Sequence, residues 1–420
     1  MGLRARIAAA SGDAELRRLG AGLVAVLRIE GAGDDIVLRL DDGVVVFEGS
    51  ATPDIVLAAA EDDWEKLLVA PPPPRFQAFT ALAIANPAFT LSGDPLTIAQ
   101  ARAVIERLFE LVVLSPVAQA TPVARTMSQI SGRYYKVALP EGPAEIYIES
   151  AGSGRPVMFL HTAGADSRQF HGQLADVALA ADWRMIAPDM PFHGRSMPPE
   201  GWQGEPYRLS GARYLGWCAS IIEHVIGEKA IVAGGSMGAA LALLLAAERP
   251  DLVAGVIAIE PPFRSKGRRN PFQHHVGVHA GLHNAAFVRG LMSPTSPIDN
   301  RRRASWIYSQ GAPEIYAGDL AFYSDEFDGA EVAPRIDAAR TPVSLLCGAY
   351  DYSATPEDGA KLAALLPGAD LRVMDGLGHF PMCEHPDLFR PHLVAALAHW
   401  HYRRRPLSED PSFDVGNRSW

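Results

Sequence analysis

A serine flanked by glycines, within Gly234-Gly235-Ser236-Met237-Gly238, follows a run of branched apolar residues and precedes a run of alanine and leucine. This is the context of a sharp strand-to-helix turn that exposes a nucleophilic hydroxyl at the carboxyl end of a sheet. Side chains at Gly234 or Gly238 would collide with neighbouring backbone, and the turn holds the serine in a strained conformation. The pattern predicts covalent chemistry with Ser236 as the nucleophile.

Serine is a poor nucleophile unless a neighbouring base takes its proton, and two residues farther along the chain can meet this need. Asp351 lies just beyond the apolar run in LLCGAYD, and His379 lies in the glycine-flanked loop of MDGLGHF. Histidine, with a reference pKa of about 6.5, can act as a base close to neutrality. We therefore predict His379 as the base and Asp351 as the carboxylate that orients it.

Three other residues could be mistaken for members of this triad. Asp375 and Glu384 flank His379 and could serve as the acid, and His385 could serve as the base. Neither Glu384 nor His385 belongs to the glycine loop that follows the last strand, so we prefer Asp351 and His379.

The loop FLHTAGADSRQF, which follows the first buried strand, can supply the backbone N–H groups that stabilise an oxyanion. We expect one donor from Met237 and the second from Ala163, with Thr162 as its competitor. The segment DMPFHGRS, residues 189–196, follows the next strand as a tight turn. We interpret that turn as structural, shaping a wall of the site.

These residues require a sheet whose strands end along one edge. A leading hairpin and a series of apolar strand-like runs, spaced by helical segments, lie at residues 134–139, 144–150, 157–161, 183–189, 230–235, 253–260, 341–348 and 369–376. Strands that alternate with helices predict right-handed crossovers and a mostly parallel, doubly wound α/β sheet that is covered on both faces. The alternation stops between residues 261 and 340, which we predict to be an inserted helical cap.

One stretch, residues 230–247, is long enough and apolar enough to span a bilayer. Its glycines and its central Ser236 favour a buried strand followed by a buried helix. We therefore expect no membrane span.

The GGSMG turn, the DMPFHGRS turn, the GAYD acid loop and the GLGHF histidine loop occur in this order, and with them residues 133–402 resemble the α/β-hydrolase superfamily. The resemblance implies a serine hydrolase that cleaves a carboxylic ester through an acyl-enzyme intermediate, with no metal and no organic cofactor. The family commonly has HG and a large residue where this chain has HTAG, which leaves Ala163 and Thr162 as alternatives for the second oxyanion donor. Serine at position 236 disfavours the relatives that use an aspartate nucleophile.

Other activities fit the same resemblance. Thioester or lactone hydrolysis uses the same chemistry, and enzymes that cleave a carbon–carbon bond in vinylogous diketones share the GxSMG elbow. A non-catalytic lipid carrier or scaffold is an alternative of another class, against which the complete triad argues. The acyl chain and leaving group depend on the shape of the cap residues.

The residues before the hydrolase-like region predict a smaller α+β domain over 1–113. Short strand-like runs between 21 and 58 indicate an antiparallel meander, and helices and a short strand follow at 61–69, 76–85, 89–93 and 95–114. This order resembles the sterol-carrier-protein type of lipid-binding domain, which implies an apolar ligand. A packing or dimerisation domain without a ligand is the alternative, so a homo-oligomer is open.

The remaining boundaries follow from composition. Residues 114–131 carry prolines without strong periodicity and are interpreted as a linker, residues 132–402 as the hydrolase domain, and residues 403–420 as a loose polar tail.

Charge and cysteine content limit the partners and the location. The 420 residues include 38 Lys and Arg against 48 Asp and Glu, a net charge of −10, so we expect no nucleic acid as a partner. The resemblances described above imply instead a small, apolar ester substrate. Cys218, Cys347 and Cys383 lie far apart without a CxxC pair, which indicates neither a disulfide framework nor a zinc site and fits the cytoplasm.

The cap region carries histidines and basic runs of its own. His275, His279 and His283 would share one face of a helix, but no acidic residue joins them, so we expect a polar surface or pocket lining rather than a metal site. The basic runs at 264–269 and 301–303 are expected to be solvated, although one arginine could meet a substrate carboxylate.

Overall fold

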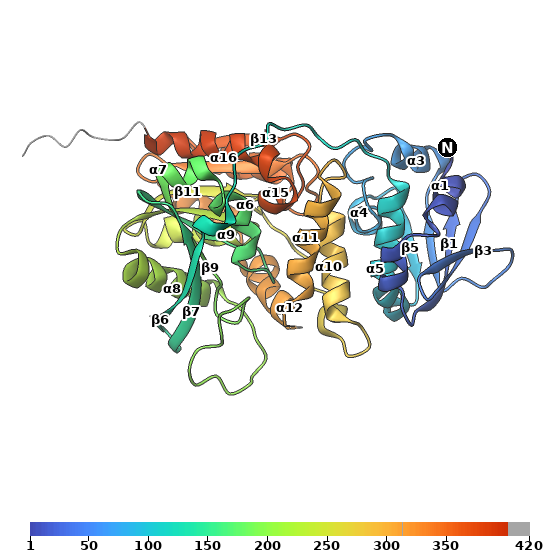
Figure 1. Cartoon of the computed structure of the whole chain (residues 1–420), viewed down its shortest axis with the longest axis horizontal. Coiled ribbons are helices and arrows are strands. Elements are labelled where there is room, and N and C mark those ends of the chain that lie inside the picture. The colour runs from blue at the N-terminus through green and yellow to red at the C-terminus, as the bar shows by residue number, and fades with distance from the viewer. Residues whose placement is uncertain (313, 402–420) are drawn as a thin grey trace, which may run out of the picture.

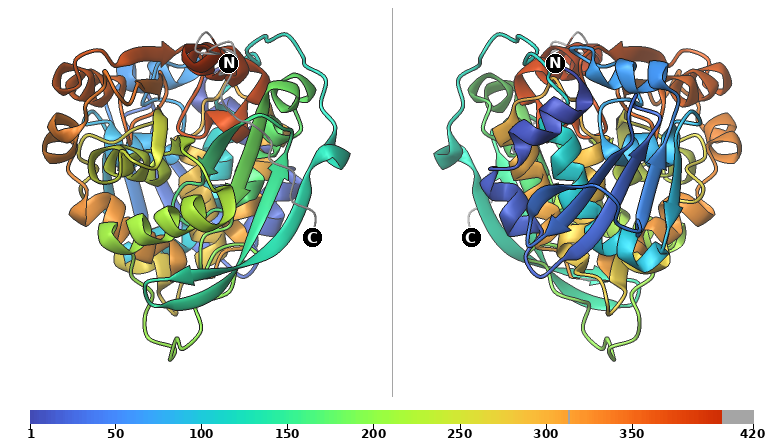
Figure 2. Two further views of the ribbon diagram at one scale, coloured as in Figure 1. Left: turned by 90° about the vertical axis from the view of Figure 1, so that its left-hand side faces the viewer. Right: turned by 90° about the vertical axis from the view of Figure 1, so that its right-hand side faces the viewer.

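The computed structural model describes residues 1–312 and 314–401, which form two sheets with separate hydrophobic cores (Figures 1 and 2). The smaller sheet has the order β3-β2-β1-β4-β5 and is built from β1 (Val24–Glu30), β2 (Ile36–Asp41), β3 (Val44–Glu48), β4 (Ile55–Ala58) and β5 (Thr90–Gly93). Its helices are α1 (Leu3–Ala10), α2 (Ala14–Leu19), α3 (Glu61–Leu68), α4 (Phe79–Ala85) and α5 (Pro95–Val112). We call residues 1–113 the N-terminal unit.

The predicted meander is wrong at its last strand. Strands β1, β2 and β3 are antiparallel as expected, but β4 pairs with β1 in parallel. Strand β3 ends with Glu48 level with the middle of β1, and Ile55 of β4 pairs with Leu27 at nearly the same level. A short connection is therefore enough to place β4 beside β1. Alternation of apolar residues predicts a strand but does not specify its neighbour.

The larger sheet has eight strands in the order β13-β12-β11-β10-β8-β9-β7-β6. These strands are β6 (Ser131–Leu139), β7 (Gly142–Ala151), β8 (Arg155–Leu160), β9 (Trp183–Pro188), β10 (Ala230–Gly235), β11 (Val253–Ile259), β12 (Val343–Gly348) and β13 (Asp370–Met374). From β9 to β13 every pairing is parallel, and β6 and β7 form an antiparallel hairpin. All six residues of β10 and of β12 are buried, so both faces of the sheet are covered, which confirms the predicted class of fold.

Helices α6 (His171–Leu174), α7 (Val177–Asp182), α8 (Gly211–Ile221), α9 (Met237–Glu248), α14 (Pro356–Leu365), α15 (Pro381–Glu384) and α16 (Pro386–His401) surround this sheet. The stretch 230–247 is divided between β10 and α9, as the glycines predicted. In the part of the chain that the structure describes, no helix has the length and apolar character needed to cross a membrane.

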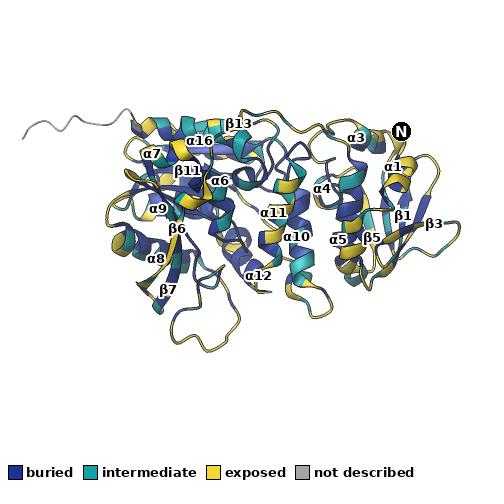
Figure 3. Cartoon of the chain, viewed as in Figure 1, coloured by how far each residue is buried: buried dark blue, intermediate teal, exposed yellow. Residues whose placement is uncertain are grey.

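The segment between β11 and β12 contains α10 (Ala280–Leu291), α11 (Ile298–Ser309), α12 (Ile315–Leu320) and α13 (Gly329–Val332). A turn of π-helix, Ala321–Glu326, continues α12. Helix α10 packs against α4 and α5, so this segment lies between the larger sheet and the N-terminal unit (Figure 1). Figure 3 shows that α5 is buried over much of its length.

The connection that we interpret as a linker runs in extended form along the larger unit (Figure 1). Ala118 N donates to Thr295 O at 2.9 Å, and Thr126 N donates to Ala175 O at 2.8 Å. Arg125 forms an ion pair with Asp387 at 2.5 Å. These contacts hold the connection against the larger unit. The predicted tail, 403–420, lies outside the described residues.

Buried ion pairs join the N-terminal unit to α10 and α11. Glu110 on α5 contacts Arg107 of its own helix at 2.5 Å and Arg301 of α11 at 2.9 Å, and Arg289 of α10 contacts Glu15 at 2.8 Å. Burial would raise the pKa of Glu110, but Arg301, Arg289 and Arg107 together hold it below its ordinary value. Arg301 was expected to be solvated. Its side chain is instead only 15% exposed, because a carboxylate of the other unit pairs with it.

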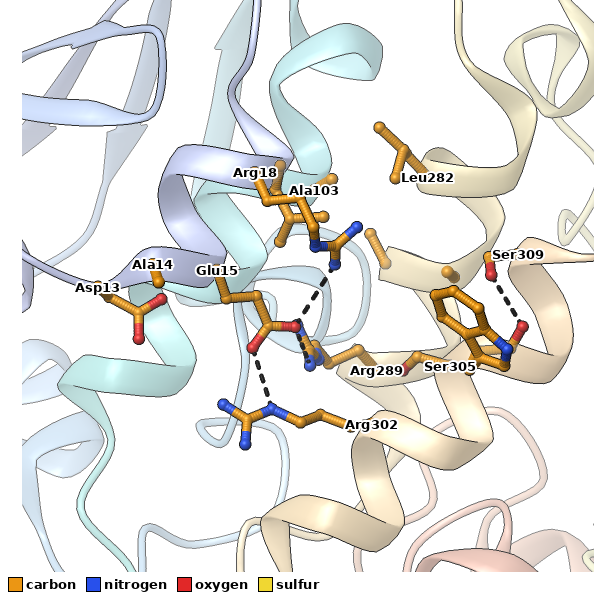
Figure 4. Close-up of a pocket in the computed structure, with 14 residues that line it drawn as sticks. Asp13, Ala14, Glu15, Arg18, Ala103, Leu282, Arg289, Arg302, Ser305 and Ser309 are labelled. Carbon is orange, nitrogen blue, oxygen red and sulfur yellow. Dashed lines mark hydrogen bonds and ion pairs between the residues drawn. The ribbon is translucent and has the colours of Figure 1, made fainter.

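Figure 4 shows the outer part of this network, in which Arg18, Arg289 and Arg302 surround Glu15 beside a pocket of about 480 Å³. Each of these cations therefore already has a carboxylate partner.

The N-terminal unit also contacts the loop that carries Asp351. Tyr350 donates its hydroxyl to Pro72 O at 2.8 Å, and Gln77 Nε2 donates to Tyr350 O at 3.1 Å. The residue next to Asp351 is thus held by the smaller unit.

Replacing Glu110 by Ala should destabilise the protein by about 3–5 kcal/mol, because buried guanidinium groups lose their counter-charge. Glu200→Ala is the control: Glu200 pairs with Lys136 at 3.0 Å and both side chains are 61% exposed, so solvent screens the pair and its loss should change stability far less. Urea unfolding measures both changes. Equal small losses would show that the interface network does not stabilise the fold.

Candidate active site

Ser236 lies in the sharp turn between β10 and α9, with φ 53° and ψ −109°. A Cβ added at Gly234 would lie 2.1 Å from Gly238 O, and one added at Gly238 would lie 2.5 Å from Leu160 O. Neither position accepts a side chain unless the backbone moves, which is the reason the sequence pattern gave for these glycines. The left-handed backbone at Ser236 is held by this close packing and by its N–H, which donates to Ile259 O at 2.8 Å.

The three predicted triad residues meet at the carboxyl edge of the sheet. His379 Nε2 lies 2.8 Å from Ser236 Oγ, and His379 Nδ1 lies 2.6 Å from Asp351 Oδ2. The other oxygen of Asp351 accepts from Ser353 N at 2.7 Å and from Ala354 N at 3.1 Å. Because an ionised carboxylate only accepts hydrogen bonds, Nδ1 donates to Asp351 and leaves Nε2 free to accept from the serine hydroxyl. All three triad side chains are buried.

The alternative acid Glu384 contacts the histidine loop through its backbone. It accepts from Gly378 N at 2.5 Å and from Ser293 N at 2.8 Å, so it ties the loop that carries His379 to the end of α10. Burial raises the pKa of Glu384 to about 8, against the lowering effect of those two N–H groups. The alternative base His385 contacts a different part of the structure. Its Nε2 lies 3.0 Å from Ala118 O, in the connection between the units.

Glu260 was not singled out from the sequence, although it directly follows β11 as Asp351 follows β12. It is fully buried, has φ 51°, and both its carboxyl oxygens lie 2.8 Å from Gly348 N. Burial raises the pKa of Glu260 well above its ordinary range, and the neighbouring Asp351 raises it further. The upward shift favours the protonated carboxyl, which can hydrogen-bond to Asp351. A charged residue that ends an apolar run, in VAGVIAIE, was the available signal.

The backbone N–H groups near Ser236 are unequal as oxyanion donors. Thr162 N donates to Gln169 Oε1 at 2.9 Å, and Gly164 N donates to Asp319 Oδ2 at 2.7 Å. Among the described residues, the N–H groups of Ala163 and Met237 have no acceptor. The side chain of Thr162 also hydrogen-bonds to the hydroxyl of Tyr308, on α11.

Asp319 of α12 links the cap segment to two loops of the larger sheet. Besides Gly164 N, it accepts from Tyr207 OH at 2.7 Å and from His193 Nε2 at 2.8 Å. Burial lowers the pKa of His193, but the adjacent Asp319 outweighs it, so the net shift is upward. His193 lies in the DMPFHGRS turn, which is thereby joined through Asp319 to the loop of Gly164. Helix α12 thus fixes the loop that contains Ala163.

The cap histidines do not share a helical face. Helix α10 begins after His279, whose side chain caps it by accepting from Leu282 N at 3.3 Å, and His275 precedes the helix. Across residues 1–312 and 314–401, no group of three or more metal-ligating side chains is found. Within the same ranges, Cys218, Cys347 and Cys383 are free thiols.

Comparison with known proteins places this geometry in a family. The model of the alpha/beta hydrolase fold matches residues 155–386, more than half of the chain, so the protein belongs to this family of hydrolases. The chain is 25% identical over 256 residues to 2-hydroxy-6-oxo-6-phenylhexa-2,4-dienoate hydrolase of Burkholderia cepacia, covering 58% of this chain and 88% of the relative. It is 28% identical over 255 residues to the magnesium-chelatase 30 kDa subunit of Rhodobacter capsulatus, covering 57% and 86%.

Solved structures share the fold. A thermophilic esterase from Thermogutta terrifontis superposes with a TM-score of 0.56 at 20% identity, covering 64% of this chain and 98% of the esterase. The enol-lactonase from Burkholderia xenovorans superposes with a TM-score of 0.53 at 21% identity, covering 63% and 99%. The family match begins at residue 155, so the resemblance of the N-terminal unit to sterol carrier proteins stays a prediction.

Glu384→Gln should change how the stability of the protein depends on pH. The pKa of Glu384 is about 8 in the folded protein against an ordinary value of 4.5, so between these values the folded chain retains a proton that the unfolded chain has released. The contribution of this group to stability is therefore present at low pH and falls as pH rises. The unfolding free energy of the wild type minus that of the variant should therefore fall from pH 5 to pH 8, because only the wild type carries the titrating group. Urea unfolding at each pH measures both values. A difference that does not vary with pH would contradict the assignment.

Proposed function

We propose that the protein is a serine hydrolase that cleaves a carboxylic ester through an acyl-enzyme intermediate. The observation that carries the proposal is the position of His379, whose two ring nitrogens lie 2.8 Å from Ser236 Oγ and 2.6 Å from Asp351 Oδ2. In this arrangement one imidazole can remove the serine proton while the carboxylate fixes its tautomer and stabilises the imidazolium.

The reaction has two halves that use the same groups. Ser236 Oγ attacks the ester carbonyl as His379 Nε2 takes its proton, and the tetrahedral intermediate collapses when His379 returns that proton to the departing alcohol. Water then attacks the acyl-enzyme, with His379 as base, and the second intermediate releases the carboxylic acid and regenerates the serine hydroxyl. Asp351 remains ionised throughout.

We assign the oxyanion donors to the N–H groups of Met237 and Ala163. Support comes from the other N–H groups of the loop, since Thr162 N donates to Gln169 and Gly164 N donates to Asp319. A donor that already has a strong acceptor cannot stabilise the developing negative charge without losing that bond. Ala163 is thereby favoured over Thr162.

A second candidate is hydrolysis of a carbon–carbon bond in a vinylogous diketone. It is supported by the relative from Burkholderia cepacia, which bears the name of such a hydrolase and is covered over 88% of its length. A coloured 2-hydroxy-6-oxohexa-2,4-dienoate compared with p-nitrophenyl esters distinguishes the two candidates. Faster turnover of the dienoate would replace the ester assignment and keep the same nucleophile.

The proposal includes the division of the chain into domains. We propose an accessory domain over 1–113, a linker over 114–131, and a hydrolase domain over 132–402 with its cap at 261–340. An apolar ester, a cytoplasmic location and self-association through the accessory domain stay predictions.

Ser236→Ala should abolish ester hydrolysis, with a loss of about 10⁴-fold or more, because the hydroxyl forms the covalent intermediate. The methyl side chain fits the turn, so the melting temperature should change little. A fluorophosphonate probe should label Ser236 in the wild type and leave the variant unlabelled. Retained activity, or labelling at another residue, would exclude Ser236 as nucleophile.

Asp351→Asn should keep the fold yet lose most of the turnover, because an amide that donates to His379 Nδ1 favours the wrong tautomer. Initial rates on p-nitrophenyl butyrate measure the loss, and circular dichroism checks the fold. A rate close to that of the wild type would transfer the role of the acid to Glu260, the other carboxyl at this edge of the sheet.

A further inference from the structure

A cavity of about 600 Å³ lies where α4 and α5 of the N-terminal unit face the loop after β11 and the loop after β12. Its lining includes Arg102 of α5, Arg268 and Ser265 of the first loop, and Tyr352 and Ser353 of the second. Both units therefore contribute to its walls, and two of these residues closely follow Asp351.

The lining of this cavity is strongly cationic. It contains the side chains of Arg75, Arg102, Arg264, Lys266 and Arg268, with Asp358 as its one acidic residue. Asp358 forms an ion pair with Lys361 at 2.9 Å, and Arg264 pairs with Asp328. Within the described ranges, neither Arg102 nor Arg268 has an ion-pair partner, so the cavity holds positive charge that the protein does not compensate.

Arg102 is the deeply buried cation of the cavity. Its side chain belongs to a residue that is only 6% exposed, and its guanidinium lies 4.1 Å above the ring of Phe287. Nη1 donates to Thr80 Oγ1 at 3.1 Å, but Nε is buried without an acceptor in the described structure. The hydroxyl of Tyr352 is buried and equally without a partner. Unpaired buried donors are costly, and two of them beside one cavity indicate a ligand that accepts hydrogen bonds.

Glu106, one turn along α5 from Arg102, offsets only part of this charge. Its Oε2 accepts from Thr80 N at 2.9 Å and from Thr80 Oγ1 at 2.5 Å, and the carboxylate forms no ion pair with Arg102. Burial raises the pKa of Glu106 to about 7, so near neutrality it carries only part of a negative charge. A ligand anion would complete the balance of charge.

One side chain separates this cavity from the nucleophile. Ser265, in the cavity wall, donates through Oγ to Tyr323 OH at 3.1 Å, and Ser353 Oγ lies 3.4 Å from the same hydroxyl. Tyr323 also lies near Ser236, whose side chain opposes the rise in the tyrosine pKa that burial causes. Burial lowers the pKa of Arg268, but the neighbouring Tyr323 and Asp351 help to raise it above its ordinary value, so a group bound beside this cavity-lining residue lies near the catalytic residues.

Arg268 is the cation best placed to meet such a group. Its backbone N–H donates to Ser324 Oγ at 3.1 Å, which fixes the loop beside Tyr323. The residue as a whole is half-buried, and its guanidinium carries five donors in a planar fork that suits a carboxylate.

We propose that this cavity binds the free carboxylate of the acyl group, so that the preferred substrates are half-esters of short dicarboxylic acids. The proposal rests on the proposed ester hydrolysis. The N-terminal unit thereby acquires a role in substrate binding, since Arg102 supplies the buried charge while Arg268 contacts the carboxylate.

Mono-p-nitrophenyl glutarate and p-nitrophenyl valerate test the proposal, because their acyl chains have the same length and differ in the terminal carboxylate. The wild type should have the higher kcat/KM on the glutarate ester. Arg268→Gln should lower kcat/KM on that ester by about tenfold or more, the usual effect of losing a charged hydrogen bond, and leave the valerate ester within about twofold. Arg269→Gln is the matched control, because Arg269 belongs to the same loop, pairs with Asp325 at 2.5 Å and does not line the cavity; it should leave both values unchanged.

Binding of free glutarate separates this proposal from the proposed function. By isothermal titration calorimetry, Ser236→Ala should bind glutarate, and the double variant Ser236→Ala/Arg268→Gln should bind it at least about tenfold more weakly. If neither the wild type nor Ser236→Ala binds glutarate, the proposed anion site is wrong even if esters are hydrolysed. Glutarate binding with equal kcat/KM on the two esters would overturn its assignment to the substrate. If no ester is hydrolysed, the proposed function fails while the calorimetry still decides the site.

Discussion

The backbone of Ser236 occupies a left-handed conformation, and the position of every other group in the site depends on it. The turn is held by contact between backbones: Gly238 packs on Leu160 of β8, and Gly234 packs on Gly238 itself. Because β8 lies next to β10, the same contact that fixes Ser236 brings the loop of Ala163 beside it. The histidine and aspartate then reach the serine from the ends of β13 and β12, at the same edge of the sheet.

Three carboxyl groups lie around one imidazole, and their surroundings give them different states. Asp351 contacts His379 directly, whereas Glu260 and Glu384 are bound by backbone N–H groups of Gly348 and of Gly378 with Ser293. Burial raises the pKa of both glutamates, so they can hold the two loops while adding less negative charge than a pair of ionised carboxylates. Three acidic residues therefore lie near His379, but their total negative charge is smaller than three ionised carboxylates would give.

The sequence predicted the parts of the site that are set by local conformation. The roles of Gly234 and Gly238 could be predicted because only glycine fits there. Polar residues that follow strands, such as Asp351, could be predicted to lie together because parallel strands end at the same edge of the sheet. The partners of these groups come from distant segments, and no local pattern contains them. Asp319 bonds to Gly164 across 155 residues, and Arg301 pairs with a glutamate from the other unit. The helices α1 and α2 were missed because short amphipathic segments resemble a polar terminus.

The ion pairs between the two units can form only after both partners have been synthesised. Glu110 is synthesised 191 residues before Arg301, a delay of about 10–40 s at 5–20 residues per second. If the N-terminal unit folds during that interval, the face of α5 that later meets α10 and α11 is in contact with water, including the Glu110 carboxylate. The smaller unit can mature on the ribosome only as far as this face, and the last contacts that complete it are made by the cap helices and the loop of Tyr350. A nascent chain whose synthesis stops between Glu110 and Arg301 would expose this charged and partly apolar surface to chaperones.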